Sequence, residues 1–375
     1  MTGARHLYVH LPFCAARCGY CDFVTVVGRH GAHGGYVDAL LAELELERRL
    51  LADHVETVFL GGGTPTFTEA GALRRLLRAL PACEELTVEA NPETVTPELA
   101  ALLAAEGVTR VSLGAQSFQP DLLATLERRA SPDVVRRAFY HLRDASFDNI
   151  SLDLIYGIPG QSPAALERDI DEALTLTAEH LSWYELEAKP GTRFTHAHGE
   201  ELARQSEAME GYFERVVERL TAAGYRWYET ANFCLAPSSV NERDLRSRHN
   251  LAYWLGRDYL GLGIGAVSTV GALRWRNTPR LGAYVDALAK GETPLREIED
   301  LPEAVRREER AMLKLRLDEG LPLTEAKGTV DEHALTRLAA ADLIHVCPEN
   351  GVTEALVLTE RGRRLGDAVT AELLA

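Results

Sequence analysis

The sequence predicts an α/β protein whose first half is an open barrel built on six parallel strands. Short apolar, β-branched segments alternate with longer segments of helical character through this half, and such alternation is typical of a parallel sheet with right-handed crossovers. Several helical segments begin with Ser or Thr followed by Pro, which is common entry chemistry for a helix. Glycine and polar residues gather where the predicted strands end, as expected of a ligand site at the carboxyl edge of such a sheet.

The six strand–helix units define a partial, TIM-like (βα)6 barrel over residues 1–198. Six units are two fewer than a closed barrel of this kind needs, so we expect the barrel to be open. The strands are predicted at Leu7–Leu11, Thr57–Leu60, Leu86–Glu89, Arg110–Leu113, Ile150–Ile155 and Leu181–Leu186. The helices are predicted at Gly35–Leu51, Glu69–Leu80, Thr96–Glu106, Pro120–Ala130, Pro132–Ala145 and Pro163–Thr177.

Residues 199–300 form the second predicted domain, a mixed α/β segment in which the regular alternation is lost. We expect a helix over Glu200–Ala223, a strand-like piece over Tyr225–Phe233 and an exposed polar loop over Leu235–Arg248. The segment that follows the loop, His249–Thr269, is rich in aromatic residues and glycine.

Residues 301–375 form the third predicted domain, which has a winged-helix-like pattern. Two helices precede two short strands near Ile344–Val346 and Ala355–Leu358, and a final helix follows. This domain carries 10 Lys and Arg against 14 Asp and Glu, a net charge of −4. Because a DNA-binding winged helix is normally basic, we interpret this domain as a packing or lid module.

The composition is that of a globular protein, with 46% hydrophobic and 26% charged residues. No apolar run approaches the roughly 20 residues that span a bilayer, and the N-terminus lacks the features of an export signal, so we expect a cytoplasmic protein. The formal net charge of −16 disfavours nucleic acid as a partner. Any anionic ligand is therefore expected on a few specific arginines.

Three cysteines lie within eight residues directly after the first predicted strand, with the spacing C-x3-C-x2-C. They are Cys14, Cys18 and Cys21. Thiolates bind zinc or iron–sulfur clusters. A zinc site would need a fourth ligand, either His10 or a distant cysteine, whereas an iron–sulfur cluster on three cysteines leaves one iron open to a ligand. The remaining cysteines are isolated in the sequence: Cys83, Cys234 and Cys347.

This cysteine loop, with Tyr20 before its last cysteine, resembles that of the radical S-adenosylmethionine (SAM) superfamily. The resemblance implies a 4Fe–4S cluster on the three cysteines, an open iron that takes the amino and carboxylate groups of SAM, and reductive cleavage of SAM to a 5′-deoxyadenosyl radical. It also implies a reductant such as flavodoxin or ferredoxin. Gly61–Gly63 suit this interpretation because a backbone without Cβ atoms can approach the methionine end closely.

Eight further segments narrow the resemblance to the oxygen-independent coproporphyrinogen III oxidase-like (HemN/HemW) group. In order they read YVHLPFC, FLGGGTPT, VEANPE, SLGAQSF, DLIYGIPGQ, YELEAKPGT, HNLAYW and GLGIGAVS. The resemblance implies a cofactor site at Tyr8, Tyr20, Gly62, Gly63, Thr64, Glu89, Gln116, Arg128, Asp153 and Val267. Within it, Glu89 and Asp153 would take ribose hydroxyls or an ammonium group, and Arg128 would pair with a carboxylate bidentately.

Two features separate the branches of this group. True oxidases carry a fourth cysteine where this chain has Phe23, and the HemW-like heme chaperones lack this cysteine. The chaperones also carry the motif HNxxYW, which is matched here by His249, Asn250, Tyr253 and Trp254. Both features resemble the chaperone branch, which implies heme binding and delivery to heme-accepting proteins, membrane-associated acceptors among them. His249 is then a candidate heme ligand. The alternative for His249 is a buried His–Tyr–Trp cluster that packs the second domain onto the barrel.

Other functions stay open at this stage. One is coproporphyrinogen III oxidation, and another is a methyltransferase or cyclopropanase that uses two SAM molecules. The chain departs from the group at several positions that bear on porphyrin binding. Glu127 and Ala130 stand where the group has glycine and histidine around Arg128, and Val267 replaces a histidine. Arg129 is a second candidate for the role of Arg128.

Overall fold

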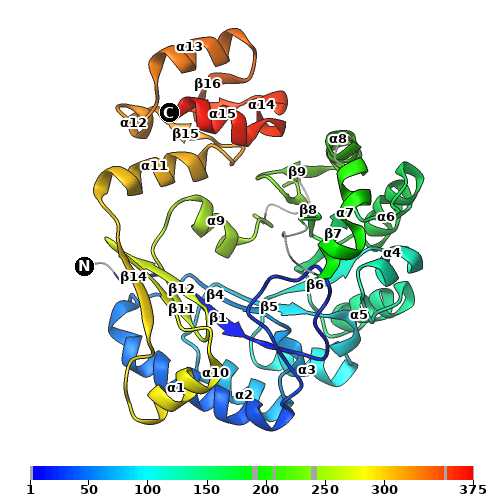
Figure 1. The fold of residues 1–375 in the computed structure, drawn as a ribbon, viewed down its shortest axis with the longest axis vertical. Helices are drawn as coiled ribbons and strands as arrows, with labels where there is room; N and C mark the ends of the chain where they lie inside the picture. Colours follow the sequence, from blue (N-terminus) through cyan, green and yellow to red (C-terminus); the bar gives the residue numbers. More distant parts are fainter. Residues whose placement is uncertain (1–2, 188–192, 206–207, 238–242, 350–352, 375) are drawn as a thin grey trace.

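The computed structural model describes residues 3–187, 193–205, 208–237, 243–349 and 353–374 (Figure 1). Its centre is a run of six parallel strands in the order β1-β4-β5-β6-β7-β8. Their bounds are β1 His6–Leu11, β4 Thr57–Gly62, β5 Glu85–Ala90, β6 Arg110–Gln116, β7 Ile150–Tyr156 and β8 His180–Glu185. The predicted partial barrel is therefore confirmed, with each predicted strand at its expected place.

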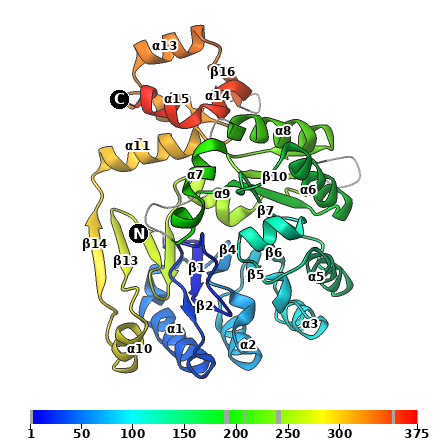
Figure 2. The same ribbon diagram turned by 45° about the vertical axis from the view of Figure 1, so that its right-hand side comes forward.

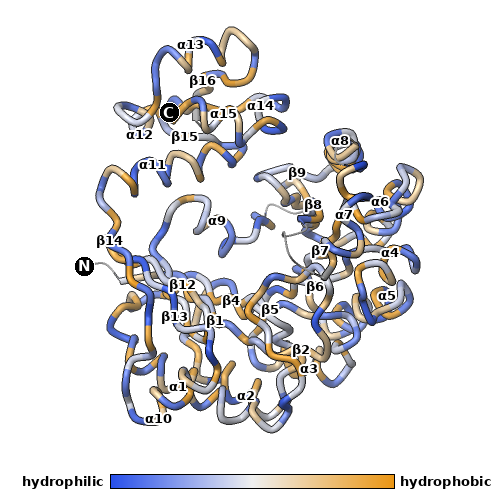
Figure 3. The backbone as a smooth tube through the Cα atoms, viewed as in Figure 1, coloured by the Kyte–Doolittle hydropathy of each residue, from blue (hydrophilic) through white to orange (hydrophobic). Residues whose placement is uncertain are grey.

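The helices that cover the outside of these strands also lie where the sequence predicts them. They are α1 His33–Glu47, α2 Ala70–Ala79, α3 Pro97–Ala105, α4 Pro120–Thr125, α5 Pro132–Asp144 and α6 Pro163–Leu176. The Oγ atoms of Thr96 and Ser162 accept bonds from the N–H groups of Leu99 and Ala165 at 3.2 Å each, which is the predicted cap chemistry. Figure 3 shows the alternation of apolar and polar residues along these elements.

Helix α4 is shorter than the predicted Pro120–Ala130 because the chain turns at Glu127. This residue has φ +55°, a left-handed conformation that favours glycine over side chains with a Cβ atom. The turn carries Arg128 back toward the barrel. The left-handed backbone conformation at position 127 therefore explains why the related group has glycine there.

Glycine at position 127 is expected to stabilise the protein relative to alanine. Glu127→Gly and Glu127→Ala both remove the carboxylate, and only glycine adopts φ +55° without strain, a difference of about 1 kcal/mol. Thermal denaturation of the two variants side by side checks this, with the glycine variant unfolding about 1–2 °C higher. An alanine variant of equal or greater stability would contradict it.

The second half of the chain extends the same sheet at both edges. Strand β11 (Tyr259–Leu262) pairs in parallel with β1, and the antiparallel strands β12 (Val267–Val270), β13 (Leu273–Asn277) and β14 (Arg296–Asp300) follow. At the other edge β10 (Asn232–Leu235) pairs with β8 and with β9 (Tyr225–Trp227). The residues predicted as a separate middle segment thus share one twelve-stranded sheet with the barrel.

Two details of the second half differ from the sequence predictions. The helix predicted over Glu200–Ala223 is replaced by α7 (Arg193–Gln205) and α8 (Met209–Ala222). The predicted exposed loop falls partly outside the described residues, and in its described part Leu245 is buried beside Tyr228 and Cys234. An apolar side chain in a polar stretch gave no periodic signal by which this burial could be predicted.

The C-terminal domain has its own apolar core around Leu315, Leu338, Leu356 and Leu373. Its helices are α11 Glu303–Lys314, α12 Leu323–Ala326, α13 Glu332–Ala340, α14 Glu360–Arg364 and α15 Gly366–Leu373, and its sheet has the order β15 (Leu321–Pro322), β17 (Thr353–Leu358), β16 (Ile344–Glu349). Figures 1 and 2 both place this domain above one side of the barrel, with α14 next to α8. Arg363 of α14 also donates to the carbonyl of Trp227 in β9. No helix in the described ranges is both long enough and apolar enough to cross a membrane.

Candidate functional site

A cavity of about 410 Å³ opens where the central strands end. The cysteine loop forms one side of it, and the ends of β4 to β8 contribute the rest. Eleven of the predicted site residues line this cavity: Cys14, Cys18, Tyr20, Cys21, Gly62, Gly63, Thr64, Glu89, Gln116, Arg128 and Asp153. Residues far apart in the sequence are thus brought together at the carboxyl edge of the sheet, the expected place for a ligand.

The cysteine loop is anchored at its base. Strand β2 (Phe13–Cys14) pairs in parallel with β3 (Val26–Val27), and the Phe13 ring packs on His33 and Tyr36. Beyond this base the N–H of Cys21 donates to the carbonyl of Cys18 at 3.2 Å. The loop therefore holds its first cysteine rigidly and turns the other two toward the cavity.

The chemistry of the thiols fits a positively charged iron group. Burial raises the pKa of Cys14 and the pKa of Cys21 above the usual thiol value, so these sulfur atoms need a cationic partner to become thiolates. In the described part of the chain, no three His, Cys, Asp or Glu side chains are arranged around a single metal ion. Three cysteines on one side of a cavity of this size fit a cluster, which is larger than one ion.

The zinc alternative needed a fourth ligand, and His10 does not supply it. The Nε2 atom of His10 lies 2.8 Å from the carbonyl oxygen of Val24, and its Nδ1 atom lies 3.1 Å from the hydroxyl of Tyr8. Both ring nitrogens of His10 are thus engaged inside the protein.

The glycines at the end of β4 permit a close approach to the cysteine loop. A Cβ atom on Gly63 would lie 2.5 Å from the carbonyl oxygen of Pro12 and 3.0 Å from Sγ of Cys14. Gly62 has φ +114°, and a Cβ there would lie 2.6 Å from the ring of His10. The GGG segment is therefore required by the packing of strand against loop, as well as by any ligand that approaches its backbone.

Two partly buried carboxyl groups face the cavity from β5 and β7. Glu89 accepts a bond from the N–H of Gly62 at 3.1 Å, and Asp153 accepts one from Oγ of Ser112 at 2.8 Å. Burial, and then the charge of Asp153, raises the pKa of Glu89 to about 8. Burial also raises the pKa of Asp153. A cationic group or hydroxyl donors between these two side chains would relieve the repulsion, and the ammonium, sulfonium and ribose groups of SAM have this character.

Two arginines line the cavity, the exposed Arg17 of the cysteine loop and the less exposed Arg128. Arg128 donates from its Nη2 atom to Oδ1 of Asn91 at 2.8 Å and to the carbonyl of Gly114 at 3.0 Å, and its Nη1 lies 3.7 Å from Sγ of Cys18. Its Nε is buried and has no partner in the described ranges. Arg129, the other candidate, is exposed and borders a separate surface depression. Arg128 thus offers an unsatisfied donor beside the cysteines.

Gln116 reaches the cavity through an irregularity in β6. The pairing of β6 with β7 shifts register between Gly114 and Gln116, and Gln116 has φ +66°. A bulge of this kind redirects a side chain that regular alternation would place elsewhere. Such conformations are concentrated at functional sites.

Tyr8 and Val267 do not line the cavity. The hydroxyl of Tyr8 contacts His10, and its ring stacks on Phe59. Val267 lies in β12, where it pairs with Arg276. Val267 thus lies outside the cavity, whereas Tyr8 lies just behind its wall, because a Cβ on Gly61 would meet both the Tyr8 ring at 3.1 Å and the Glu89 carboxyl at 3.2 Å.

His249 also lies away from the cavity, at the opposite end of the barrel strands. Its Nδ1 is 2.7 Å from Oγ1 of Thr57, the first residue of β4, and its Nε2 is 3.3 Å from the hydroxyl of Tyr253. The six residues of β4 span roughly 16 Å. Burial lowers the pKa of His249 to about 3, so the ring is neutral. This arrangement matches the packing alternative, since both ring nitrogens are engaged with other side chains.

Several residues at the cavity were not assigned from the sequence. Asn91 joins two of its parts, because its Nδ2 donates to Oγ1 of Thr64 at 2.9 Å while its Oδ1 holds Arg128. Its place in the segment EANPE at the end of a strand was the available signal. Tyr184, Glu185 and Glu187 line the cavity from the end of β8. Ser112 lies inside β6, where nothing in the sequence distinguishes it from other strand residues.

Comparison with known proteins agrees with the geometry. A family model for the Radical SAM superfamily matches residues 8–173. The chain is 39% identical to the heme chaperone HemW of Mycobacterium tuberculosis, over 98% of this chain and 94% of that protein. It is 34% identical to the heme chaperone HemW of Bacillus subtilis, over 99% of each. The structure of the coproporphyrinogen III oxidase HemN of Escherichia coli, a radical SAM enzyme, has a TM-score of 0.82 and 22% identity, and the match covers 100% of this chain and 91% of that one; it establishes a shared fold.

Proposed function

The chain belongs to the HemW family of radical SAM proteins, and on that premise we propose that it binds heme and delivers it to heme-accepting proteins. The observation that carries the proposal is the full-length similarity to curated heme chaperones, at 39% identity. Membership in the radical SAM superfamily also implies a 4Fe–4S cluster and SAM.

The cavity residues are suited to hold these two groups. Cys14, Cys18 and Cys21 would ligate the cluster, which supplies the electron for SAM cleavage when it is reduced. The unsatisfied edge of Arg128 would take the SAM carboxylate, and Glu89 and Asp153 would face its cationic and ribose groups. A reductant such as flavodoxin or ferredoxin is the electron donor we propose. The cytoplasm is the proposed compartment, because exposed thiols persist there in reduced form.

Phe23 favours the chaperone over the oxidase. The side chain of Phe23 lines the cavity beside Cys21 and is 66% exposed. The oxidase branch has a cysteine at this position, and a phenylalanine ring has no atom that can ligate a metal. We infer that a fourth thiolate is not part of the chemistry of this chain.

The proposal is tested by incubating the reduced, anaerobically reconstituted protein with SAM and heme, with SAM and coproporphyrinogen III, and with SAM and a methyl acceptor. With SAM and heme we expect stable, stoichiometric uptake of heme, which is measured by absorption spectroscopy after gel filtration. With SAM and coproporphyrinogen III we expect no conversion of propionate to vinyl groups. Vinyl products would identify an oxidase instead, and transfer of a methyl group from SAM to an added substrate would identify a methyltransferase.

A further inference from the structure

A second cavity, of about 700 Å³, lies between the barrel and the C-terminal domain. Strands β7 to β9 and helix α8 line one side, and Arg316, Leu358 and residues 363–368 line the other. Tyr184, Glu185 and Glu187 border this cavity and the cysteine cavity alike. The two spaces are therefore neighbours, and a ligand in the second would lie beside a ligand in the first.

The barrel side of this second cavity is lined by a cluster of aromatic rings. The ring of Tyr156 stacks on Phe213 with centroids 5.8 Å apart, and Phe213 meets Trp227 edge-on at 5.5 Å. All three rings line the cavity. The indole Nε1 of Trp183, another lining residue, is buried and has no partner in the described part of the chain. A cluster of this kind suits a large planar ligand with apolar faces.

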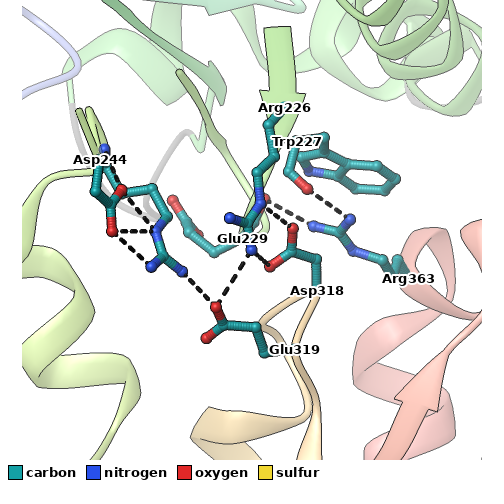
Figure 4. A network of polar contacts seen from close by, with 8 residues as sticks. Arg226, Trp227, Glu229, Asp244, Asp318, Glu319 and Arg363 are labelled. Carbon is teal, nitrogen blue, oxygen red and sulfur yellow. Dashed lines mark hydrogen bonds and ion pairs between the residues drawn. The ribbon is translucent and has the colours of Figure 1, made fainter. Parts of the chain in front are cut away.

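The C-terminal domain contributes the guanidinium of Arg363, which forms no direct ion pair among the described residues and has the carboxylates of Asp318 and Glu229 nearby. Arg363 lies 3.6 Å over the ring of Trp227 and donates to the carbonyl oxygens of Trp227 and Glu229, at 2.8 and 3.3 Å. Figure 4 shows this arrangement and shows Asp318 turned toward Arg226. Among the described residues no carboxylate forms an ion pair with Arg363, and its buried Nε has no acceptor.

The other two arginines of this cavity already have acidic partners. Arg316 pairs with Asp367 at 2.5 Å, and Arg364 pairs with both Glu214 and Glu360. Burial lowers the pKa of Arg363 to about 10, so this side chain is charged at neutral pH. Arg363 is therefore the group in the cavity that would gain most from an added carboxylate.

Resting on the function proposed above, we propose that heme binds in this second cavity, with its ring against the side chains of Tyr156 and Phe213 and a propionate on Arg363, which covers one face of Trp227. A planar macrocycle with carboxylate side chains matches an aromatic cluster beside a cation that forms no direct ion pair. The acidic residues Glu185 and Glu187 lie at the border shared with the cysteine cavity, so the propionates are directed toward the C-terminal domain. His249 borders neither cavity and is not the heme ligand in this arrangement.

Binding of heme and of its dimethyl ester to the full-length protein tests this assignment. The ester has the same ring and iron but no carboxylates. Arg363→Gln is expected to weaken heme binding about tenfold or more and to leave ester binding unchanged. The control is Arg361→Gln, because Arg361 is exposed, donates to the carbonyl of Ala341 and does not line the cavity. We expect this control to bind both compounds as the unsubstituted chain does.

A second variant keeps the assignment testable if Arg363→Gln folds poorly. Phe213→Leu removes one ring of the aromatic cluster and is expected to weaken heme and ester binding to the same extent. If the unsubstituted chain binds no heme, both the proposed function and this site are refuted. If it binds heme and neither Arg363→Gln nor Phe213→Leu changes the affinity, the site alone is refuted. A changed heme spectrum in His249→Ala, with normal binding by Arg363→Gln, would also overturn the site.

Discussion

Cys18→Ser will abolish the iron–sulfur cluster. A serine hydroxyl is far less acidic than a thiol, so it does not replace a thiolate as an iron ligand at neutral pH. Cys18 lies on the loop that faces the cavity, and no other cysteine lines that cavity besides Cys14 and Cys21. Anaerobic reconstitution followed by iron and sulfide analysis is expected to give one cluster in the unsubstituted chain and only background iron in the variant.

Cys83→Ser is the matched control for this experiment. Cys83 is a partly buried thiol outside the cavity, and its Sγ donates to the carbonyl of Glu85 at 3.4 Å. We expect this variant to retain the full iron content and to give the same EPR signal with SAM. A Cys18→Ser protein that keeps its iron would mean that the three cysteines do not form the cluster site.

The barrel and its cysteine site were predictable because both depend on patterns of residues that are close together in the sequence. The alternation of apolar strands with capped helices fixes the order of the sheet, and the carboxyl ends of parallel strands share one edge. Any polar residue that follows a predicted strand is thereby brought to that edge. Glu89 and Asp153 reach the cavity for this reason, and they come from different strands.

Where local patterns are absent, the sequence predictions fail in identifiable ways. Strand β11 has four residues and pairs with β1 in parallel after the short helix α9 (Arg248–Trp254). Neither element is long enough to continue the barrel pattern, so the pattern did not include them. His249 has the residue type of a heme ligand, but it lies on a helix that packs against the beginning of β4 rather than against its end. The motif HNxxYW identifies residues that belong together and does not reveal which end of the barrel they occupy.

The second cavity could not be predicted from the sequence for the same reason. Its walls include Tyr156, Trp227 and Arg363, which lie in the barrel, in the segment after it and in the C-terminal domain. No short sequence pattern relates an aromatic residue of the barrel to an arginine of the C-terminal domain. The sequence suggested that this domain is a packing or lid module, and in the structure Arg363 of this domain lines the cavity next to the barrel.

Arg128→Ala will weaken SAM binding about 30-fold or more while the cluster remains. Truncating one partner of a buried, hydrogen-bonded charge pair costs about 2 kcal/mol or more, which corresponds to roughly that factor in affinity. The proposed pair is the SAM carboxylate on the unsatisfied Nε edge of Arg128, which is held in place by Asn91 and Gly114. Titration of SAM into the reduced protein, followed by the change in the EPR signal of the cluster, measures the affinity.

Arg129→Ala is the neighbouring control, since Arg129 is exposed and does not line the cavity. Its SAM affinity is expected to equal that of the unsubstituted chain, which would decide between the two adjacent arginines. Iron content separates two roles for Arg128, because its Nη1 also lies 3.7 Å from Sγ of Cys18. If Arg128→Ala loses its iron, this arginine supports the cysteine loop instead of the ligand. If it keeps both its iron and its SAM affinity, the carboxylate of SAM must bind elsewhere in the cavity.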